Sequence, residues 1–351
     1  MEESEDFASI FCVWTAEKQM NESCQYKVSV IIPVYGVEKF VERCVRSLMD
    51  QTLVGVEYIF VDDATPDHSM EIIKRVLEEY PQRKKHVQII HHLQNLGLPA
   101  ARNSGLRIAK GEYVFHCDSD DYADSDMLQV MYGLAKVRDC DIVWVDWFLT
   151  YADTERYMKQ PAFEESMDAL KAMLCGGMKY NVWNKLVRRS LYTENHIEFP
   201  AGYGMGEDMT MMMLFAFSKK VAYLPKAFYH YVKTNAISFS QTYSEKHKKE
   251  LYHNVQRILD FMYARYGKLL DKELHFFRLE TKFPLLTIGT SQENYRLWTA
   301  LYPESNKYIW ANRYISLRSR IIQWCAWRRQ WWLVRVYYNL IINGLYRMIY
   351  K

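Results

Sequence analysis

Three carboxylates gather within four residues, directly after an apolar run. The run Tyr113–Cys117 is followed by Asp118, Asp120 and Asp121. Like charges this close repel one another unless a cation is shared among them. Carboxylate oxygens suit Mg²⁺ or Mn²⁺, and such a metal would in turn hold an anionic substrate, most often a diphosphate. An ordinary Asp-rich loop after a strand is the alternative interpretation.

The elements that must position these acids follow an alternating strand and helix pattern. Short β-branched runs predict strands at 28–34, 56–61, 87–90, 113–117 and 141–145. Between them, apolar residues recur at helical spacing. This alternation is typical of an α/β fold with a mostly parallel sheet flanked by helices. The polar residues that follow the strands would then share one sheet edge, where open sheets bind ligands: Tyr35, Asp62, Asp63, Asp118 and Asp120.

Two familiar nucleotide-binding patterns are absent after the first strand. The sequence there is Pro33-Val-Tyr35-Gly36, which is neither GxGxxG nor GxxxxGK[ST]. A dinucleotide-dependent dehydrogenase and a P-loop NTPase are therefore excluded. A nucleotide held by a metal, a stacking aromatic ring and an acidic hydrogen-bond partner fits better.

Composition favours a folded protein of the cytoplasm. The chain has 351 residues, 25% of them charged, and a net charge of +3. Its seven cysteines are scattered without metal-ligand spacing, which favours reduced thiols. The acidic start MEESEDF is unlike a signal peptide. No uninterrupted apolar run reaches the length of a transmembrane helix.

Six stretches occur in the order and spacing of one known family, over residues 27–240. They are VSVIIPVYG (28–36), YIFVDDATPDHS (58–69), NLGLPAARNSGL (95–106), GEYVFHCDSDD (111–121), VWNKL (182–186) and MGEDM (205–209). With these motifs the chain resembles the family 2 glycosyltransferases of bacterial surface-polysaccharide type. The resemblance implies the GT-A fold, a Rossmann-like nucleotide-diphospho-sugar transferase sheet. It also implies inverting transfer of a sugar from a nucleotide-diphosphate donor.

The resemblance implies that four residues contact the donor nucleotide. Tyr35 would stack on the base and Pro33 would line the same pocket. Asp63 would accept a hydrogen bond from the base N3–H, which favours uracil and therefore a UDP-sugar. Arg102 would point towards the nucleotide. The alternatives are a strand-capping tyrosine, a turn acid and an ordinary surface or ion-paired arginine. Asp62 is interpreted as structural support.

The Asp118-Ser-Asp120 stretch matches the family's DxD motif. Asp120 would ligate Mg²⁺ or Mn²⁺, and Asp118 would contact the ribose or the metal through water. His230 is a further candidate ligand. Lys233 is a candidate for the diphosphate, although many relatives carry arginine there, so that bidentate phosphate contact would be lost.

Glu207 and Asp208 supply the candidate general base for an inverting displacement. The preceding glycines predict a flexible loop, and Met209–Phe217 predicts the helix that follows. Asp208 is the proposed base, and Glu207 would orient it or bind the acceptor. Acids at a helix start should ionise easily, although they are also ordinary partners of the helix dipole. Trp183 would either stack on a sugar or belong to the core.

The sequence predicts three regions: an N-terminal extension at 1–26, the catalytic domain at 27–240 and a helical region at 241–351. From Asn312 to the end there is no Asp or Glu, whereas arginines alternate with tryptophans and tyrosines. Such segments commonly lie in a membrane interface. Peripheral attachment to the inner face of the cell membrane is therefore expected, without a nucleic-acid partner. A helical cap packed on the catalytic domain is the alternative.

The sequence thus predicts a metal-dependent glycosyltransferase that acts on a glycan or lipid-linked acceptor. Two rivals stay open. One is a non-catalytic subunit that binds a nucleotide-sugar or glycan, and the intact acidic motifs count against it. The other is a sugar nucleotidyltransferase, which would leave Glu207 and Asp208 without a role and would need a basic, Gly-rich phosphate loop.

Overall fold

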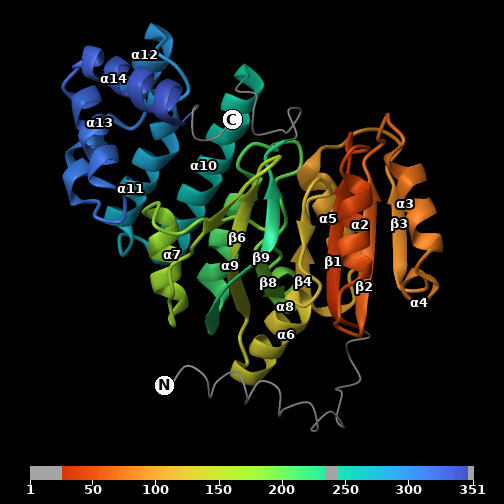
Figure 1. Cartoon of the computed structure of the whole chain (residues 1–351). Coiled ribbons are helices and arrows are strands. Elements are labelled where there is room, and N and C mark those ends of the chain that lie inside the picture. Colours follow the sequence, from red (N-terminus) through yellow and green to blue (C-terminus); the bar gives the residue numbers. More distant parts are fainter. Residues whose placement is uncertain (1–25, 235–243, 347–351) are drawn as a thin grey trace, which may run out of the picture. The chain divides into compact units, whose positions relative to one another are not determined.

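The computed structural model describes residues 26–234 and 244–346 of the chain (Figure 1). Of the expected N-terminal extension, residues 1–25 lie outside these ranges, and so do residues 347–351 at the end of the basic C-terminal segment. The five strands expected from the sequence are all present. They are β1 (Tyr26–Val34), β2 (Val56–Asp62), β3 (Val87–His91), β4 (Gly111–His116) and β6 (Ile142–Thr150).

The first half of the sheet is parallel, in the order β3-β2-β1-β4. Its strands are connected by helices α2 (Val41–Met49), α3 (Ser69–Glu78), α4 (Pro81–Lys84) and α5 (Leu98–Ile108). The central strand β1 is buried from Val28 to Val34, as its unbroken apolar sequence predicts. Helix α5 packs tightly on this strand, because a Cβ atom on Gly105 would lie 2.5 Å from Ile31 Cγ2. This close approach positions the side chains of α5 near the sheet edge.

The second half of the sheet mixes strand directions. Strand β8 (Lys185–Arg188) is antiparallel to both β4 and β6, and β9 (Val221–Val232) is parallel to β6. Two short strands complete the sheet: β5 (Tyr122–Ala123), paired with β9, and β7 (Glu155–Met158), paired with β6. The sequence did not predict β5, β7, β8 or β9. Three of them are too short for an apolar period to develop, and β9 is interrupted by Pro225 and Lys226.

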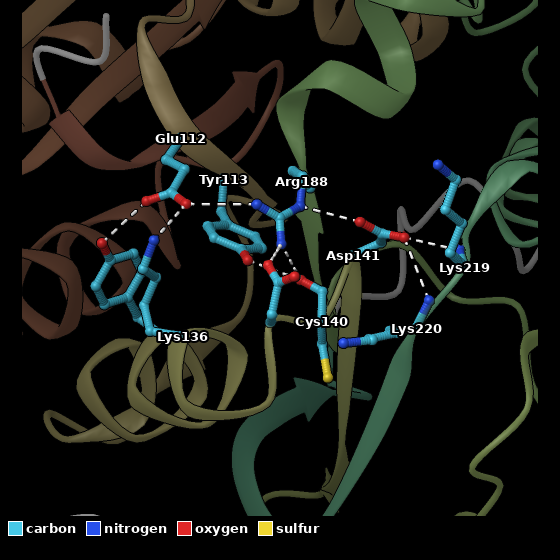
Figure 2. Close-up of polar contacts among 10 residues, drawn as sticks. Glu112, Tyr113, Lys136, Cys140, Asp141, Arg188, Lys219 and Lys220 are labelled. Atoms are coloured by element: carbon cyan, nitrogen blue, oxygen red, sulfur yellow. Dashed lines mark hydrogen bonds and ion pairs between the residues drawn. The ribbon is translucent and has the colours of Figure 1, made fainter. Parts of the chain in front are cut away.

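Arg188 ties the two halves of the sheet together at the end of β8 (Figure 2). Its guanidinium contacts three carboxylates: Nε lies 3.0 Å from Asp141 Oδ1, Nη2 lies 2.8 Å from Asp139 Oδ1 and Nη1 lies 3.5 Å from Glu112 Oε1. Nη2 also donates to the Cys140 carbonyl at 3.0 Å. This cluster fixes the antiparallel register in which Tyr113 lies opposite Arg188.

We expect Arg188→Ala to lower the free energy of unfolding by about 2 kcal/mol, because Asp141 and Asp139 lose a charged hydrogen-bond donor and Glu112 loses an ion-pair partner. Chemical denaturation monitored by circular dichroism would measure the change. Lys84→Ala is the control, since its pair with Glu78 is exposed and should contribute less than about 1 kcal/mol. Equal losses in both variants would contradict the structural role of Arg188.

The chain divides into two compact units. The first comprises the described residues up to Ser166 together with Tyr180–Asn254, and the second comprises Met167–Lys179 with the described residues from Val255 onward. The boundary expected near residue 240 therefore falls later, within helix α10 (Glu245–Tyr266). The first unit also contains the helices α6 (Met127–Arg138), α8 (Arg189–Glu194) and α9 (Thr210–Phe217).

The second unit is helical, as the sequence predicts. It contains α11 (Asp271–Lys282), α12 (Gln292–Ala300), α13 (Leu317–Trp327) and α14 (Trp331–Tyr337), with most of α7 (Ser166–Leu174) (Figure 1). Trp298 is fully buried at its centre, with Lys282 Nζ 4.2 Å from the ring centroid. Among the described residues, no helix is both long and apolar enough to cross a membrane.

Candidate active site

The carboxyl ends of β1, β2 and β4 lie at one edge of the sheet. Parallel pairing sets Val34 opposite Asp62 and Ile31 opposite His116, so the residues that follow these strands meet there. This arrangement brings Tyr35, Asp63 and Asp118 to the same edge, as the sequence predicts, and open sheets commonly bind ligands at such an edge.

Tyr35 is 50% exposed, whereas Pro33 is buried in β1. The loop after Tyr35 turns at Gly36, whose φ of +67° lies in the left-handed region that favours glycine. The Gly36 amide donates to Thr65 Oγ1 at 2.8 Å, which links the ends of β1 and β2. An exposed ring on an anchored loop is available to stack on a flat ligand.

Asp63 is buried and already accepts several hydrogen bonds. The amides of Leu96 and Gly97 donate to its two oxygens at 2.8 Å each, and His92 Nδ1 lies 2.6 Å from Oδ1. A carboxylate has about four acceptor positions, so roughly one is left for a ligand. The neighbouring Asp62 accepts from the Thr65 amide and lies 2.8 Å from His91 Nδ1, which agrees with its interpretation as structural support.

The three clustered aspartates differ in their surroundings. Asp121 is fully buried, where it accepts from the Tyr229 hydroxyl at 2.8 Å and from the Val232 amide at 2.7 Å. Burial and the negative charges of Asp120 and Asp118 raise the pKa of Asp121 well above its usual range. Asp121 is therefore a structural residue, and Asp118 and Asp120 are the two acids that the sequence predicts as ligand contacts.

The chemistry of this donor set fits a divalent cation that is shared with a substrate. Mg²⁺ is commonly held by one or two carboxylates together with substrate phosphates, rather than by a complete protein cage. In the part of the chain that the structure describes, no three His, Cys, Asp or Glu side chains form a metal cage. Asp118 and Asp120 supply two hard oxygen ligands in a region crowded with negative charge. The residues present thus fit a metal that arrives with a diphosphate.

His230 and Lys233 lie on β9 and after it. The two ring nitrogens of His230 contact Glu155 Oε1 at 2.7 Å and Asp124 Oδ1 at 3.2 Å. To ligate a metal it would have to give up one of these contacts, so we leave His230 out of the metal site. Burial lowers the pKa of Lys233, but the charges of Asp121 and Asp120 oppose this change. Lys233 therefore lies near the clustered aspartates, as a residue that contacts a diphosphate should.

Arg102 is ion-paired, which is one of the alternatives to a nucleotide contact that the sequence left open. It is 1% exposed and bridges the two acidic motifs. Its Nη2 donates to Asp118 Oδ1 at 2.9 Å, and its Nε donates to Glu207 Oε1 at 3.2 Å. Helix α5 thus supplies a buried guanidinium. It contacts Asp118 of the DxD motif through one nitrogen and Glu207 through another.

Glu207 and Asp208 lie in a short 3₁₀ turn, Glu207–Met209, which leads into α9. Burial raises the pKa of Glu207 to about 8, although Arg102 acts in the opposite direction. Burial also raises the pKa of Asp208, to about 6, against the charges of Arg102 and Lys185. The expectation that both acids ionise easily is therefore wrong. Both acids therefore hold a proton more tightly than a free carboxylic acid does, and Glu207 more tightly than Asp208, which separates their roles.

The structure adds residues to the site whose roles the sequence did not suggest. Lys185, within the VWNKL motif, is 1% exposed, and its charge acts on Asp208. Its Nζ donates to the Asn181 carbonyl at 2.7 Å and to Asn184 Oδ1 at 2.8 Å. The Asp118 amide donates to the Tyr229 hydroxyl at 3.1 Å, so Tyr229 supports two of the clustered aspartates.

The loop before Glu207 is held from helix α10. Asn254 Nδ2 donates to the carbonyls of Tyr203 and Met205, each at 2.9 Å, and the Met205 amide donates to Glu250 Oε2 at 3.0 Å. The loop predicted to be flexible is therefore anchored. Nothing in the local sequence marks Asn254 or Glu250, because their partners lie about fifty residues away.

Trp183 belongs to the core. It is buried, with its ring stacked on Tyr229 at 4.7 Å and on Tyr231 at 5.1 Å between centroids. Trp147 packs edge-on against it at 5.2 Å. Of the two interpretations of Trp183, the structure supports the packing role. Its ring supports Tyr229, which in turn contacts the aspartate cluster.

Comparison with known proteins agrees with this geometry. Residues 29–210 match the family model for glycosyl transferase family 2. The uncharacterized glycosyltransferase EpsJ of Bacillus subtilis is 33% identical over 58% of this chain and 60% of its own length. The cholesterol galactosyltransferase of Borreliella burgdorferi is 30% identical over 67% of this chain and 68% of its own length. The chain therefore belongs to glycosyl transferase family 2.

The fold has a solved counterpart. The crystal structure of S. aureus TarS 1–349 in complex with UDP-GlcNAc has a TM-score of 0.65 and 20% identity, and covers 91% of this chain and 92% of that chain. This likeness confirms the predicted GT-A fold. The chain spans about 60% of the length of EpsJ.

Proposed function

We propose that this chain is an inverting, metal-dependent glycosyltransferase that uses a nucleotide-diphosphate sugar. The observation that carries the proposal is the Arg102 bridge, because one buried cation links Asp118 of the metal motif to Glu207 beside the candidate base. The family supports sugar transfer, and a role in bacterial surface polysaccharides is proposed from the family resemblance of the motifs.

The donor is proposed to be a UDP-sugar. Tyr35 would stack on uracil, Pro33 would line the pocket, and the remaining acceptor position of Asp63 would receive the uracil N3–H. Lys233 would contact the diphosphate as a point charge. The shared fold with a UDP-GlcNAc complex supports this choice of nucleotide.

Mg²⁺ or Mn²⁺, when bound at Asp118 and Asp120, would offset the charge that develops on the departing diphosphate. Ionised Asp208 accepts the proton of the acceptor hydroxyl. The acceptor oxygen forms a bond to the anomeric carbon while the bond from that carbon to the β-phosphate oxygen breaks. The nucleoside diphosphate leaves from the opposite face, and the configuration inverts. The positive charges of Arg102 and Lys185 favour the ionised form of Asp208.

A donor panel tests this proposal. We expect one UDP-sugar, in the presence of Mn²⁺ or Mg²⁺, to raise the melting temperature and to release uridine diphosphate slowly by hydrolysis. GDP-, dTDP- and CMP-sugars should do neither, and EDTA should abolish both effects. A response to none of the nucleotides would contradict the active-site assignment. Stabilisation that persists in EDTA would contradict the metal.

The acceptor is proposed to be a glycan or a lipid-linked glycan at the inner face of the cell membrane. This placement would bring the cytoplasmic nucleotide-sugar and a membrane-bound acceptor to the same enzyme. The second unit carries the surface that would make the contact.

A further inference from the structure

Large apolar side chains are exposed along the last helices of the second unit. Leu317 at the start of α13 is 56% exposed, and Ile321, one turn later, is 41% exposed. On α14, Trp332 is 62% exposed and Val336 is 46% exposed. Leu340, in the π-helical segment Tyr338–Tyr346, is 65% exposed. Exposed apolar residues that recur along adjacent segments mark an interaction surface more often than scattered single ones do.

Four of these residues lie on the helices α13 and α14, and Leu340 follows α14. On α13, Ile322, Cys325 and Ala326 are buried. In α14, Trp332 and Val336 are one turn apart, and the buried Val334 faces away from them. The Arg318 guanidinium lies 5.8 Å from the Tyr337 ring centroid, which joins the two helices.

The sequence that contains these residues is strongly basic. From Asn312 to Lys351 the sequence contains eight Arg and Lys and no acid. Arg328 lies 5.7 Å from the ring centroid of Trp324 and 5.5 Å from that of Trp327, so cationic and aromatic groups are interleaved. Arg335 is exposed on α14 between the apolar positions. Interleaved arginines, tryptophans and aliphatic side chains suit the boundary between lipid headgroups and acyl chains.

Arg329 occupies a backbone position that favours glycine. Its φ is +57°, and it ends α13 in a Schellman arrangement. The Gln330 amide donates to the Cys325 carbonyl at 2.8 Å, and the Arg329 amide donates to the Ala326 carbonyl at 3.0 Å. Glycine is the usual residue at this position, so the exposed arginine is kept there at some cost in stability.

We propose that this surface, formed by Leu317, Ile321, Arg328, Arg329, Trp332, Arg335, Val336 and Leu340, docks on an anionic lipid bilayer. The arginines would contact lipid phosphates, and the apolar side chains would enter the interface. Nucleic acid fits this surface less well. Its bases would stack on the aromatic rings, but the exposed leucines, isoleucine and valine would gain no matching contact. The purpose of the docking rests on the proposed function, because a lipid-linked acceptor would be reached there, but the binding itself requires no transfer.

Vesicle flotation with the full chain tests the inference. Wild-type protein should float with phosphatidylglycerol-containing vesicles, bind much less to pure phosphatidylcholine, and dissociate at high salt. Arg329→Gly should weaken binding to the anionic vesicles by about fivefold, because one cation is lost, while its melting temperature stays equal or rises. Trp332→Ser should also weaken binding.

Matched controls come from the first unit. Arg107→Ala removes an exposed arginine and Leu93→Ser removes a fully exposed leucine, and neither should change vesicle binding. The inference would be overturned if the wild-type protein did not bind anionic vesicles. It would also be overturned if the Arg329→Gly and Trp332→Ser variants bound them as well as the wild type does. Tighter binding to RNA than to vesicles would overturn it in favour of a nucleic-acid partner. Vesicle binding without any response to UDP-sugars would leave this inference standing and reject the proposed function.

Discussion

Asp208→Asn should reduce kcat for sugar transfer by about 10³-fold, because a positioned general base typically contributes between about 10² and 10⁴. Asparagine has nearly the same shape but cannot accept the acceptor's proton. Donor binding should change little, since the metal and nucleotide positions are assigned to other residues. Steady-state kinetics together with calorimetric binding of the donor would separate the two effects. A variant with nearly full kcat would show that Asp208 is not the base.

Glu207→Gln is the matched comparison for this variant. Burial raises the pKa of Glu207, which favours its protonated form, and glutamine mimics that form. The loss in kcat should therefore stay below about tenfold. The acid limb of the wild-type pH profile should follow Asp208, whose pKa is raised to about 6. Because the base must be ionised, activity should fall as the pH drops through that value. A larger loss in Glu207→Gln than in Asp208→Asn would reverse the two roles.

Arg102→Met should lower the free energy of unfolding by about 3–5 kcal/mol, the range expected when one partner of a buried ion pair is removed. The reason is that Asp118 would lose its cationic partner and Glu207 would lose a hydrogen-bond donor. Transfer should fall as well, because the metal motif and the base would lose their shared support. Denaturant unfolding would measure the first effect, and donor kinetics on the folded fraction the second.

Arg102→Lys should not restore the wild-type values, because a lysine ammonium cannot reproduce donors fixed on two sides of a planar guanidinium. Arg107→Met, on the same helix but exposed, is the control and should stay within about 0.5 kcal/mol of the wild type. If Arg102→Met were as stable as Arg107→Met, the bridge would have no structural role.

The first half of the fold could be predicted because its signals are local. Strands β1, β2 and β4 are buried runs of β-branched and aromatic residues, and the helices between them show the period of an α-helix. Once the strands are parallel, the position of Tyr35, Asp63 and Asp118 at one edge follows from geometry alone. The short strand β8 and the mixed pairing around it could not be predicted, because they depend on contacts between segments far apart in the sequence.

The chemistry of the site was only partly predictable for the same reason. The sequence identified the acids, but the pKa values of Glu207 and Asp208 depend on burial by distant segments. The partners of the buried Arg102 include Glu207, which lies 105 residues away in the sequence. Lys185 could be recognised only as part of a motif, because its proximity to Asp208 arises when β8 joins the sheet. Motifs therefore predicted which residues matter, whereas the structure was needed to show which residue acts on which.

Binding of uridine diphosphate is the most direct test of the central claim, that Asp118 and Asp120 hold a metal together with a nucleotide diphosphate. Melting temperatures would be compared for wild-type protein and Asp120→Asn, with and without Mn²⁺. We expect uridine diphosphate to stabilise the wild type only when Mn²⁺ is present, and to leave Asp120→Asn unchanged under both conditions. Equal stabilisation of both proteins, or none of the wild type, would contradict the account.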